Sequence, residues 1–289
     1  MQGLICAGGE GTRLGDSTKA TNKHLLPVYD KPMVTYPLWN LLSAGIEDVL
    51  IVSNESQLYH FRRLFGKGNR FSAQAGHDVR IQYEAQPNPD GIADAIRQAQ
   101  DFATVRTYSN KIKGVHSITV MLGDNVFEDQ ELLVKGVKEF RKGAVCYVKK
   151  VPENLLYEQS KTGEWYAKFG MIQRYNNKVA KIEEKPKAVL DAAGNPHLPN
   201  EFASQEVVVG AYIFDNTVFD RIALLKKSGR GQYEITELLD SYLRNGELRV
   251  YQVHGWWTDC GTPDTLLLAS NKIREKTVGP ISELVKELI

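Results

Sequence analysis

Residues 4–14 read LICAGGEGTRL, and the interpretation of the whole chain depends on this stretch. An apolar run typical of a strand ends in three glycines, which are followed at once by a threonine and an arginine. Because glycine has no Cβ, its backbone N–H can approach an anion closely, and the arginine guanidinium suits phosphate oxygens. The stretch therefore predicts a nucleoside triphosphate site. The residues expected to contact the nucleotide here are Gly8, Gly9, Gly11, Thr12 and Arg13.

Two common phosphate-loop patterns do not fit this stretch. A dinucleotide fingerprint needs a third glycine where Leu14 stands, and its acidic residue about 20 positions later would be Asp30, in a turn-like segment. A P-loop needs a lysine directly after its last glycine, and none follows Gly11. The alternative without a ligand is a plain glycine-rich turn. Lys23 supplies a second cation to the same region.

Composition and charge restrict the class of protein. The chain has 289 residues, 42% hydrophobic and 25% charged, which is ordinary for a globular protein and allows one large domain or two small ones. A net charge of +1 gives no reason to expect a nucleic-acid or membrane partner. Cys6, Cys146 and Cys260 are widely spaced, which indicates buried thiols in a reducing compartment. With no secretory signal or long apolar run, we expect a cytoplasmic protein.

The order of apolar and helical segments predicts an α/β fold. In the first half, short apolar strands alternate with helical stretches, which predicts a mostly parallel sheet with helices on both faces. From about Gly143 strands outnumber helices, which indicates a smaller β-rich part. The expected strands are 48–53, 79–83, 117–122, 144–151, 170–175, 178–183, 207–214 and 248–253. The expected helices are 33–44, 56–65, 92–102, 217–226, 233–243, one beginning near 262, and 281–289.

Ligands of such sheets bind beyond the carboxyl ends of the strands, where this chain carries several unusual residues. The Gln86 amide can pair with a nucleobase edge, and Gly91 opens the next helix. Asp124 follows a buried strand, and Asp259 is a second carboxylate of this kind. Two carboxylates and substrate phosphates are a usual set of ligands for Mg²⁺. The alternatives are a proline-rich loop at Gln86 and simple turn aspartates.

The second half holds a candidate sugar site between two stretches that look inserted. Glu184 could accept hydrogen bonds from sugar hydroxyls, and Lys185 could hold a sugar phosphate; a solvated charge run is the alternative. Residues 157–167 and 189–204 flank these two and are expected to be surface excursions, because they are polar or contain Gly-Asn-Pro.

Taken in order, these motifs resemble the sugar-phosphate nucleotidylyltransferases, and the glucose-1-phosphate thymidylyltransferase branch in particular. The resemblance runs from residue 1 to about residue 270, with gaps at the two insertions. The segments that carry it are 8–14, 23–27, 30–33, 86–93, 123–125, 183–186, 230–236 and 257–262.

This resemblance implies a fold, a domain organisation and a reaction. The fold is a Rossmann-like nucleotide-diphospho-sugar transferase fold in one domain over residues 1–270, followed by a short helical tail over 271–289. Within the domain, 1–142 would bind the nucleotide and 143–270 the sugar. The implied reaction is Mg²⁺-dependent: a thymidylyl group passes from dTTP to α-D-glucose 1-phosphate, giving dTDP-glucose and pyrophosphate.

The resemblance also implies a role for each matching residue. Arg13 stabilises the leaving pyrophosphate, Lys23 draws the two reacting phosphates together, and Asp124 holds Mg²⁺ with Asp259. The nucleotide-binding residues are Gly8, Gly9, Gly11, Thr12, Gln86 and Gly91. The sugar-phosphate-binding residues are Gly170, Glu184, Lys185 and Arg230.

The chain departs from the family pattern at several positions near the implied site. Phe169-Gly170-Met171 stands where Tyr-Gly-Val is usual, and His24 stands where glutamine is common in the thymidylyl branch. A uridylyl- or cytidylyltransferase, another hexose 1-phosphate, and a non-catalytic sensor of nucleotide sugars therefore stay as alternatives. Only a short segment follows Asn271, so feedback regulation through C-terminal helices and assembly as a homo-oligomer are left open.

Overall fold

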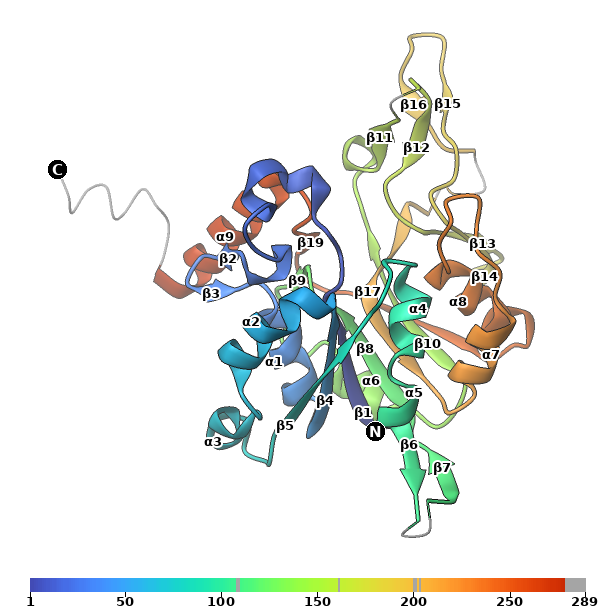
Figure 1. Ribbon diagram of the computed structural model, residues 1–289. Coiled ribbons are helices and arrows are strands. Elements are labelled where there is room, and N and C mark those ends of the chain that lie inside the picture. Colours follow the sequence, from blue (N-terminus) through green and yellow to red (C-terminus); the bar gives the residue numbers. More distant parts are fainter. Residues whose placement is uncertain (108–109, 161, 200–201, 203, 279–289) are drawn as a thin grey trace, which may run out of the picture. The chain divides into compact units, whose positions relative to one another are not determined.

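The computed structural model describes residues 1–107, 110–160, 162–199, 202 and 204–278. It has a mixed α/β fold with a central, mostly parallel sheet, as predicted (Figure 1). The chain forms two compact units. Unit 1 consists of Met1, Asp90–Val120 and Gly136–Val253, and unit 2 of Gln2–Pro89, Met121–Lys135 and His254–Ile289. The expected division into 1–142 and 143–270 is one of function and stays a prediction.

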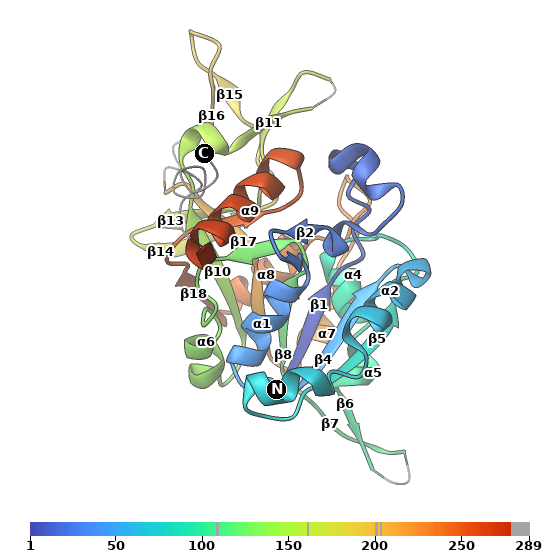
Figure 2. The ribbon, with the colours of Figure 1, turned by 90° about the vertical axis from the view of Figure 1, so that its left-hand side faces the viewer.

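Unit 2 is built on three parallel strands, in the order β1 (Gln2–Cys6), β4 (Asp48–Ser53) and β5 (Arg80–Ala85). Leu4 and Leu50 face each other across β1 and β4 and are almost completely buried, as expected for strands covered on both faces. In Figure 2, α1 (Thr35–Ser43) lies beside β1 and α2 (Glu55–Phe65) beside β5. Two of these strands lead to predicted ligand residues, because Gly8 lies two residues after β1 and Gln86 follows β5 directly.

Shorter elements complete unit 2 and carry four of its candidate ligand residues, namely Thr12, Arg13, Lys23 and Asp259. Its other helices are η1 (Thr12–Thr18), η2 (Lys23–Leu25), η3 (Asn69–Phe71), α3 (Ser72–Ala75) and α9 (Pro263–Val278). Its other strands are β2 (Pro27–Val28), β3 (Lys31–Pro32), β9 (Asn125–Phe127) and β19 (Trp257–Asp259). Strand β8 (Ile118–Leu122) and helix α6 (Val134–Glu139) each contain a boundary between the units.

Unit 1 is organised around β10 (Ala144–Lys150), which pairs antiparallel with β17 (Glu206–Phe214) and parallel with β18 (Leu248–Gln252). Strand β17 also pairs with β13 (Met171–Tyr175), and β13 pairs with β14 (Lys178–Glu183), both antiparallel. Every residue of β17 is buried. Residues 207–214 form a continuous apolar run, and the buried Glu206 forms an ion pair with Arg174. The helices of unit 1 are α4 (Ile92–Arg97), α5 (Gln100–Ala103), η4 (Glu153–Leu155), α7 (Val218–Leu224) and α8 (Ile235–Arg244).

The two insertions form hairpins that are not simple surface excursions. The first pairs β11 (Tyr157–Gln159) with β12 (Trp165–Ala167), and the second pairs β15 (Val189–Leu190) with β16 (Pro196–His197). Both project at the top of Figure 1. Their bases nevertheless join the core, because Ala167 is fully buried and Phe202 is 3% exposed.

Several predicted boundaries differ from the structure. The helix expected over 92–102 is divided into α4 and α5, because Ala99 leaves helical geometry with ψ 2°. A further hairpin, β6 (Thr104–Arg106) with β7 (Ile112–Val115), was not predicted, because none of its strand residues is buried and they lack a clear apolar alternation. The helix expected over 281–289 lies outside the described residues. In the part of the chain that the structure describes, no helix is long and apolar enough to cross a membrane. All three cysteines are free thiols.

Candidate active site

The glycine loop lies directly after β1 and is in close contact with two other predicted site residues. A Cβ on Gly8 would lie 2.7 Å from Oε1 of Gln86, and a Cβ on Gly9 would lie 2.9 Å from Cε of Lys23. Both distances are shorter than ordinary packing allows, so a Cβ at either position would displace the end of the Gln86 or Lys23 side chain. The structure thus brings Gln86 and Lys23 to the loop, as predicted. Gly11 leads into η1, where Thr12 is exposed.

Asn22 holds the turn η2 that carries Lys23 against the end of β1. Its Oδ1 accepts a hydrogen bond of 2.9 Å from the backbone N–H of His24 and so caps the turn. Its Nδ2 donates to the carbonyl of Ala7 over 3.1 Å. Sequence analysis did not identify Asn22, although an asparagine just before a short helical turn is a recognisable capping signal.

Lys23 and Asp124 form an ion pair in unit 2. Lys23 Nζ lies 2.6 Å from Asp124 Oδ2, and the two side chains are only 13% and 16% exposed. Burial alone would raise the pKa of Asp124, but the ammonium of Lys23 and the hydrogen bonds from Lys23 and Asn125 outweigh it and hold this pKa well below its usual range. Asp124 is therefore an ionised carboxylate.

Asp259 reaches the same place from a distant part of the sequence. Strand β19 pairs antiparallel with β9, so that Asp259 lies opposite Asn125, and the N–H of Cys260 donates to the carbonyl of Asp124 over 2.8 Å. Arg13 joins this group, because its Nη2 lies 3.8 Å from Oδ2 of Asp259. Two carboxylates and two cations therefore gather beside the glycine loop.

The oxygen donors of this group suit a hard divalent cation, although they do not complete its coordination. Among the described residues there is no set of three or more histidine, cysteine, aspartate or glutamate side chains placed to hold a metal ion. Asp124 and Asp259 together supply two carboxylates, and Mg²⁺ is commonly bound by one or two carboxylates with substrate phosphates and water as further ligands. The residues present fit such a site.

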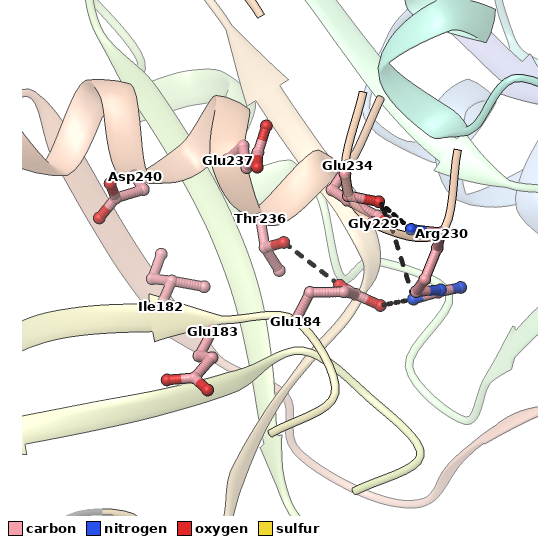
Figure 3. A pocket seen from close by; sticks show the side chains of 10 residues that line it. Ile182, Glu183, Glu184, Gly229, Arg230, Glu234, Thr236, Glu237 and Asp240 are labelled. Carbon is pink, nitrogen blue, oxygen red and sulfur yellow. Dashed lines mark hydrogen bonds and ion pairs between the residues drawn. The ribbon is translucent and has the colours of Figure 1, made fainter. Parts of the chain in front are cut away.

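Unit 1 carries a second group of polar residues, around Glu184 at the end of β14. Arg230 Nη1 donates to Oε1 of Glu184 over 3.0 Å, and Thr236 Oγ1 donates to Oε2 over 3.2 Å (Figure 3). A Cβ on Gly170 would lie 2.6 Å from Cγ2 of Thr236, so glycine lets this backbone approach the group. Burial and the nearby Glu234 carboxylate raise the pKa of Glu184, and Arg230 opposes this rise.

These residues border a cavity of about 320 Å³ within unit 1. Its walls come from β14, from α8 and from the loop that precedes α8 (Figure 3). Thr236 and Glu234 belong to this wall, and the sequence analysis identified neither as a site residue. Glu234 stands at the N-cap of α8 without a side-chain capping bond. Both residues lie in segment 230–236, which carries the family resemblance, but a ligand role was expected there only for Arg230. The lining residues are Ile182, Glu183, Glu184, Ser228, Gly229, Arg230, Glu234, Thr236, Glu237 and Asp240.

Lys185 and Gly91 complete the predicted set, both in unit 1. Lys185 Nζ lies 2.6 Å from Oε1 of Glu158, a residue of the first insertion. Gly91 precedes α4 with φ 104°, and a Cβ there would lie 2.6 Å from the carbonyl oxygen of Tyr233. Gly91 is therefore held against the segment that leads into α8, whereas Gln86, its predicted partner in reading the base, belongs to unit 2.

Comparison with known proteins shows the family to which this chain belongs. A sequence model of the family described as nucleotidyl transferase matches residues 2–276. The chain belongs to the nucleotidyl transferase family. The glucose-1-phosphate thymidylyltransferase of Mycolicibacterium smegmatis is 35% identical over 95% of this chain and 82% of its own length. The enzyme of that name from Xanthomonas campestris pv. campestris is 37% identical over 94% of this chain and 80% of its own length.

Solved structures agree with this family membership. A protein from Bacillus anthracis assigned as a glucose-1-phosphate thymidylyltransferase, in complex with sucrose, is 33% identical and has a TM-score of 0.75 over 95% of this chain and 96% of its own. A UDP-glucose pyrophosphorylase complexed with UDP-glucose has a TM-score of 0.73 over 95% of this chain and 98% of its own, at 21% identity. The second likeness shows the fold alone. The resemblance to nucleotidylyltransferases that the motifs indicated is confirmed.

Proposed function

We propose that this nucleotidyl transferase catalyses the Mg²⁺-dependent transfer of a thymidylyl group from dTTP to α-D-glucose 1-phosphate, which yields dTDP-glucose and pyrophosphate. The observation that carries the proposal is the group beside the glycine loop of unit 2, where Lys23, Arg13 and two aspartates come together. It is supported by two glucose-1-phosphate thymidylyltransferases that are 35% and 37% identical to this chain over nearly its whole length.

The residues of unit 2 suit the triphosphate. In the proposed reaction an oxygen of the sugar phosphate forms a bond to the α-phosphorus, and the bond from that phosphorus to the bridging oxygen breaks, so that its electron pair leaves with pyrophosphate. Such chemistry needs positioning and charge stabilisation more than an acid or a base. Lys23 holds the two phosphate groups together against their repulsion, and Arg13 stabilises the departing pyrophosphate. Gln86 pairs with the base, beside Gly8 of the loop.

Asp124 and Asp259 are the residues that would hold Mg²⁺. When bound there, the ion would neutralise phosphate charge. The low pKa of Asp124 keeps its carboxylate available as a ligand at any physiological pH. Its backbone and that of Cys260 are joined by a hydrogen bond of 2.8 Å, so the two carboxylates are held on neighbouring segments.

The residues of unit 1 suit the sugar phosphate. Glu184 presents a carboxylate to sugar hydroxyls, and the hydrogen bonds from Arg230 and Thr236 fix its orientation. Gly170 leaves room for a backbone N–H to contact the sugar, and Lys185 and Arg230 provide positive charge for its phosphate. A cytoplasmic location is part of the proposal, and the free thiols are compatible with a reducing compartment.

An assay of nucleotide-sugar formation across a grid of substrates tests the proposal. Purified protein is incubated with Mg²⁺, one of four triphosphates (dTTP, UTP, CTP or ATP) and one of several hexose 1-phosphates, and the products are identified by mass spectrometry. We expect dTTP with glucose 1-phosphate to give the highest kcat/KM. Equal rates with dTTP and UTP would contradict the narrow assignment, and binding without any product would favour the sensor.

Asp124→Asn is the variant that links the site to this activity. It preserves the side-chain shape beside Lys23 and removes the charge, and we expect kcat to fall by about 100-fold or more, because stabilisation worth several kcal/mol is lost. Asp16→Asn is a matched control, since Asp16 pairs with Lys19 on the exposed surface of the same unit. An Asp124→Asn enzyme with wild-type kcat would remove this carboxylate from the mechanism.

A further inference from the structure

The first insertion, the hairpin of residues 157–167, lies against the chain that follows Glu184. The N–H of Ala167 donates to the carbonyl of Pro186 over 2.9 Å, and the N–H of Ala188 donates to the carbonyl of Trp165 over 2.8 Å. Tyr166 and Lys187 form an antiparallel bridge between these bonds. The hairpin is therefore continued by a third short strand, and that strand begins at the predicted sugar-phosphate residues.

The hairpin also reaches the side chain of Lys185. Glu158 of β11 accepts a hydrogen bond of 2.6 Å from Lys185 Nζ, and the two side chains are 33% and 27% exposed. The backbone of Lys185 has φ 44°, a conformation that lysine rarely adopts, and its N–H donates to the carbonyl of Phe169 over 3.2 Å. The backbone and the side chain of Lys185 are thus both fixed, and the hairpin supplies the negative charge that binds its ammonium group.

A carboxylate in contact with an ammonium cancels much of its attraction for another anion. A phosphate that binds Lys185 must therefore separate the pair or share the ammonium with Glu158. The pair is partly shielded from water, so this competition is stronger than it would be for a fully exposed pair. A second pair on the same hairpin, Lys187 with Glu164, is much more exposed and joins the hairpin to the same strand.

We propose that Glu158 is a positioning residue that the insertion adds to the sugar-phosphate site. The Glu158 carboxylate holds the Lys185 ammonium in the ligand-free protein. The phosphate of the incoming sugar 1-phosphate then takes the place of this carboxylate beside the ammonium. The proposal rests on the proposed function, because it takes Lys185 as a ligand of that phosphate. Glu158 then sets the affinity for the acceptor and leaves the chemical step unchanged, since Lys185 acts on the sugar phosphate in both the ground state and the transition state.

Steady-state kinetics of Glu158→Gln test this role. Glutamine keeps the size of the side chain and an acceptor for Lys185 but removes the competing charge. We expect KM for glucose 1-phosphate to fall about threefold to fivefold, which is what the loss of a partly exposed ion pair allows, with kcat changed less than twofold. In a Lys185→Met background the same change should have no effect on KM, because the competition needs the ammonium.

Glu164→Gln is the matched control, because it removes the same group from the other ion pair of the same hairpin. It should leave KM at the wild-type value. A rise in KM in Glu158→Gln would overturn the proposal and make Glu158 a direct sugar ligand. An equal change in the Glu164→Gln enzyme, or in the Lys185→Met background, would overturn it in favour of a general effect on the hairpin.

Calorimetry separates this proposal from the proposed function. Inorganic phosphate and glucose 1-phosphate are titrated into each variant without nucleotide, and both should bind more tightly to Glu158→Gln than to wild type. If the wild-type protein forms no nucleotide sugar, the proposed function fails, and these titrations still test the pair. If the wild-type enzyme is active but Glu158→Gln binds both ligands as tightly as wild type does, the proposed function stands and the proposed role of Glu158 is wrong.

Discussion

At the scale of single residues, His24 shows how burial determines the state of a side chain beside the glycine loop. The ring is 2% exposed, and Nδ1 lies 2.6 Å from Oδ1 of Asn22, an atom that only accepts, so Nδ1 carries the hydrogen. Burial, which has the larger effect, and the charge of Lys23 together lower the pKa of His24 to about 3, although Asp124 opposes them. His24 is therefore neutral in the folded protein across the physiological range of pH.

This buried histidine predicts a dependence of stability on pH. The unfolded chain takes up a proton at His24 near pH 6.5, and the folded protein does so only near pH 3, so the free energy of unfolding falls as the pH drops from 6.5 towards 3. Between pH 7.5 and 5.0, His24 should lower the free energy of unfolding by about 2 kcal/mol. His24→Gln should remove this part of the loss, measured by urea unfolding at both pH values. The exposed His60 serves as control, and a His60→Gln protein should keep the wild-type dependence.

The pair of Lys23 and Asp124 predicts strong coupling between two substitutions. Removal of one partner leaves the other charged, largely buried and unpaired, so Lys23→Met should lower the free energy of unfolding by about 3 kcal/mol. Combined with Asp124→Asn, the same substitution should cost much less, because no charge is then left behind. Urea unfolding of the two single variants and the double variant measures this coupling, and purely additive effects would mean that the pair does not stabilise the fold.

At the scale of elements, short strands and turns bring the ligand residues together. Strand β19 pairs with β9 and so carries Asp259 to Asp124, and Trp257 Nε1 donates to Oδ1 of Asn125 over 2.7 Å across the same pair. The entry to α4 is fixed in a comparable way, because Gly91 adopts φ 104° and the N–H of Ala93, two residues later, donates to the carbonyl of Tyr233. In both cases the geometry of a site residue depends on a partner distant in sequence.

Gly91→Ala tests this dependence at the start of α4. A Cβ would lie 2.6 Å from the Tyr233 carbonyl oxygen, which is backbone and cannot move aside, and φ is in a region that alanine disfavours. We expect the free energy of unfolding to fall by about 2 kcal/mol or more and the Tm to be lower, both measured by calorimetry. Gly114→Ala is the control in the same unit, because a Cβ there meets nothing within 4 Å and its φ is not positive. Equal losses in both variants would contradict this account.

At the scale of the whole molecule, each unit is assembled from separate parts of the sequence and carries its own set of candidate residues. Unit 2 holds the glycine loop, Lys23, Asp124 and Asp259, and unit 1 holds Gly170, the Glu184–Arg230 pair and Lys185. The segment 121–135 and the segment from His254 onward join unit 2, although they follow long stretches of unit 1. Each compact unit therefore draws on both 1–142 and 143–270, whose expected division by function stays a prediction.

The sequence by itself determined the α/β fold class and the family, because these depend on local periodicity and on short motifs. It also predicted that Asp124 and Lys23 belong to one site, and the structure shows them as an ion pair. Only the tertiary structure decided which side chains the predicted site residues contact. Each predicted phosphate-binding cation is paired with a carboxylate, namely Arg13 with Asp259, Lys23 with Asp124, Lys185 with Glu158 and Arg230 with Glu184. The position of Glu158 beside Lys185 and the hydrogen bond from Asn22 to Ala7 likewise depend on contacts between distant segments, and no local pattern encodes such contacts.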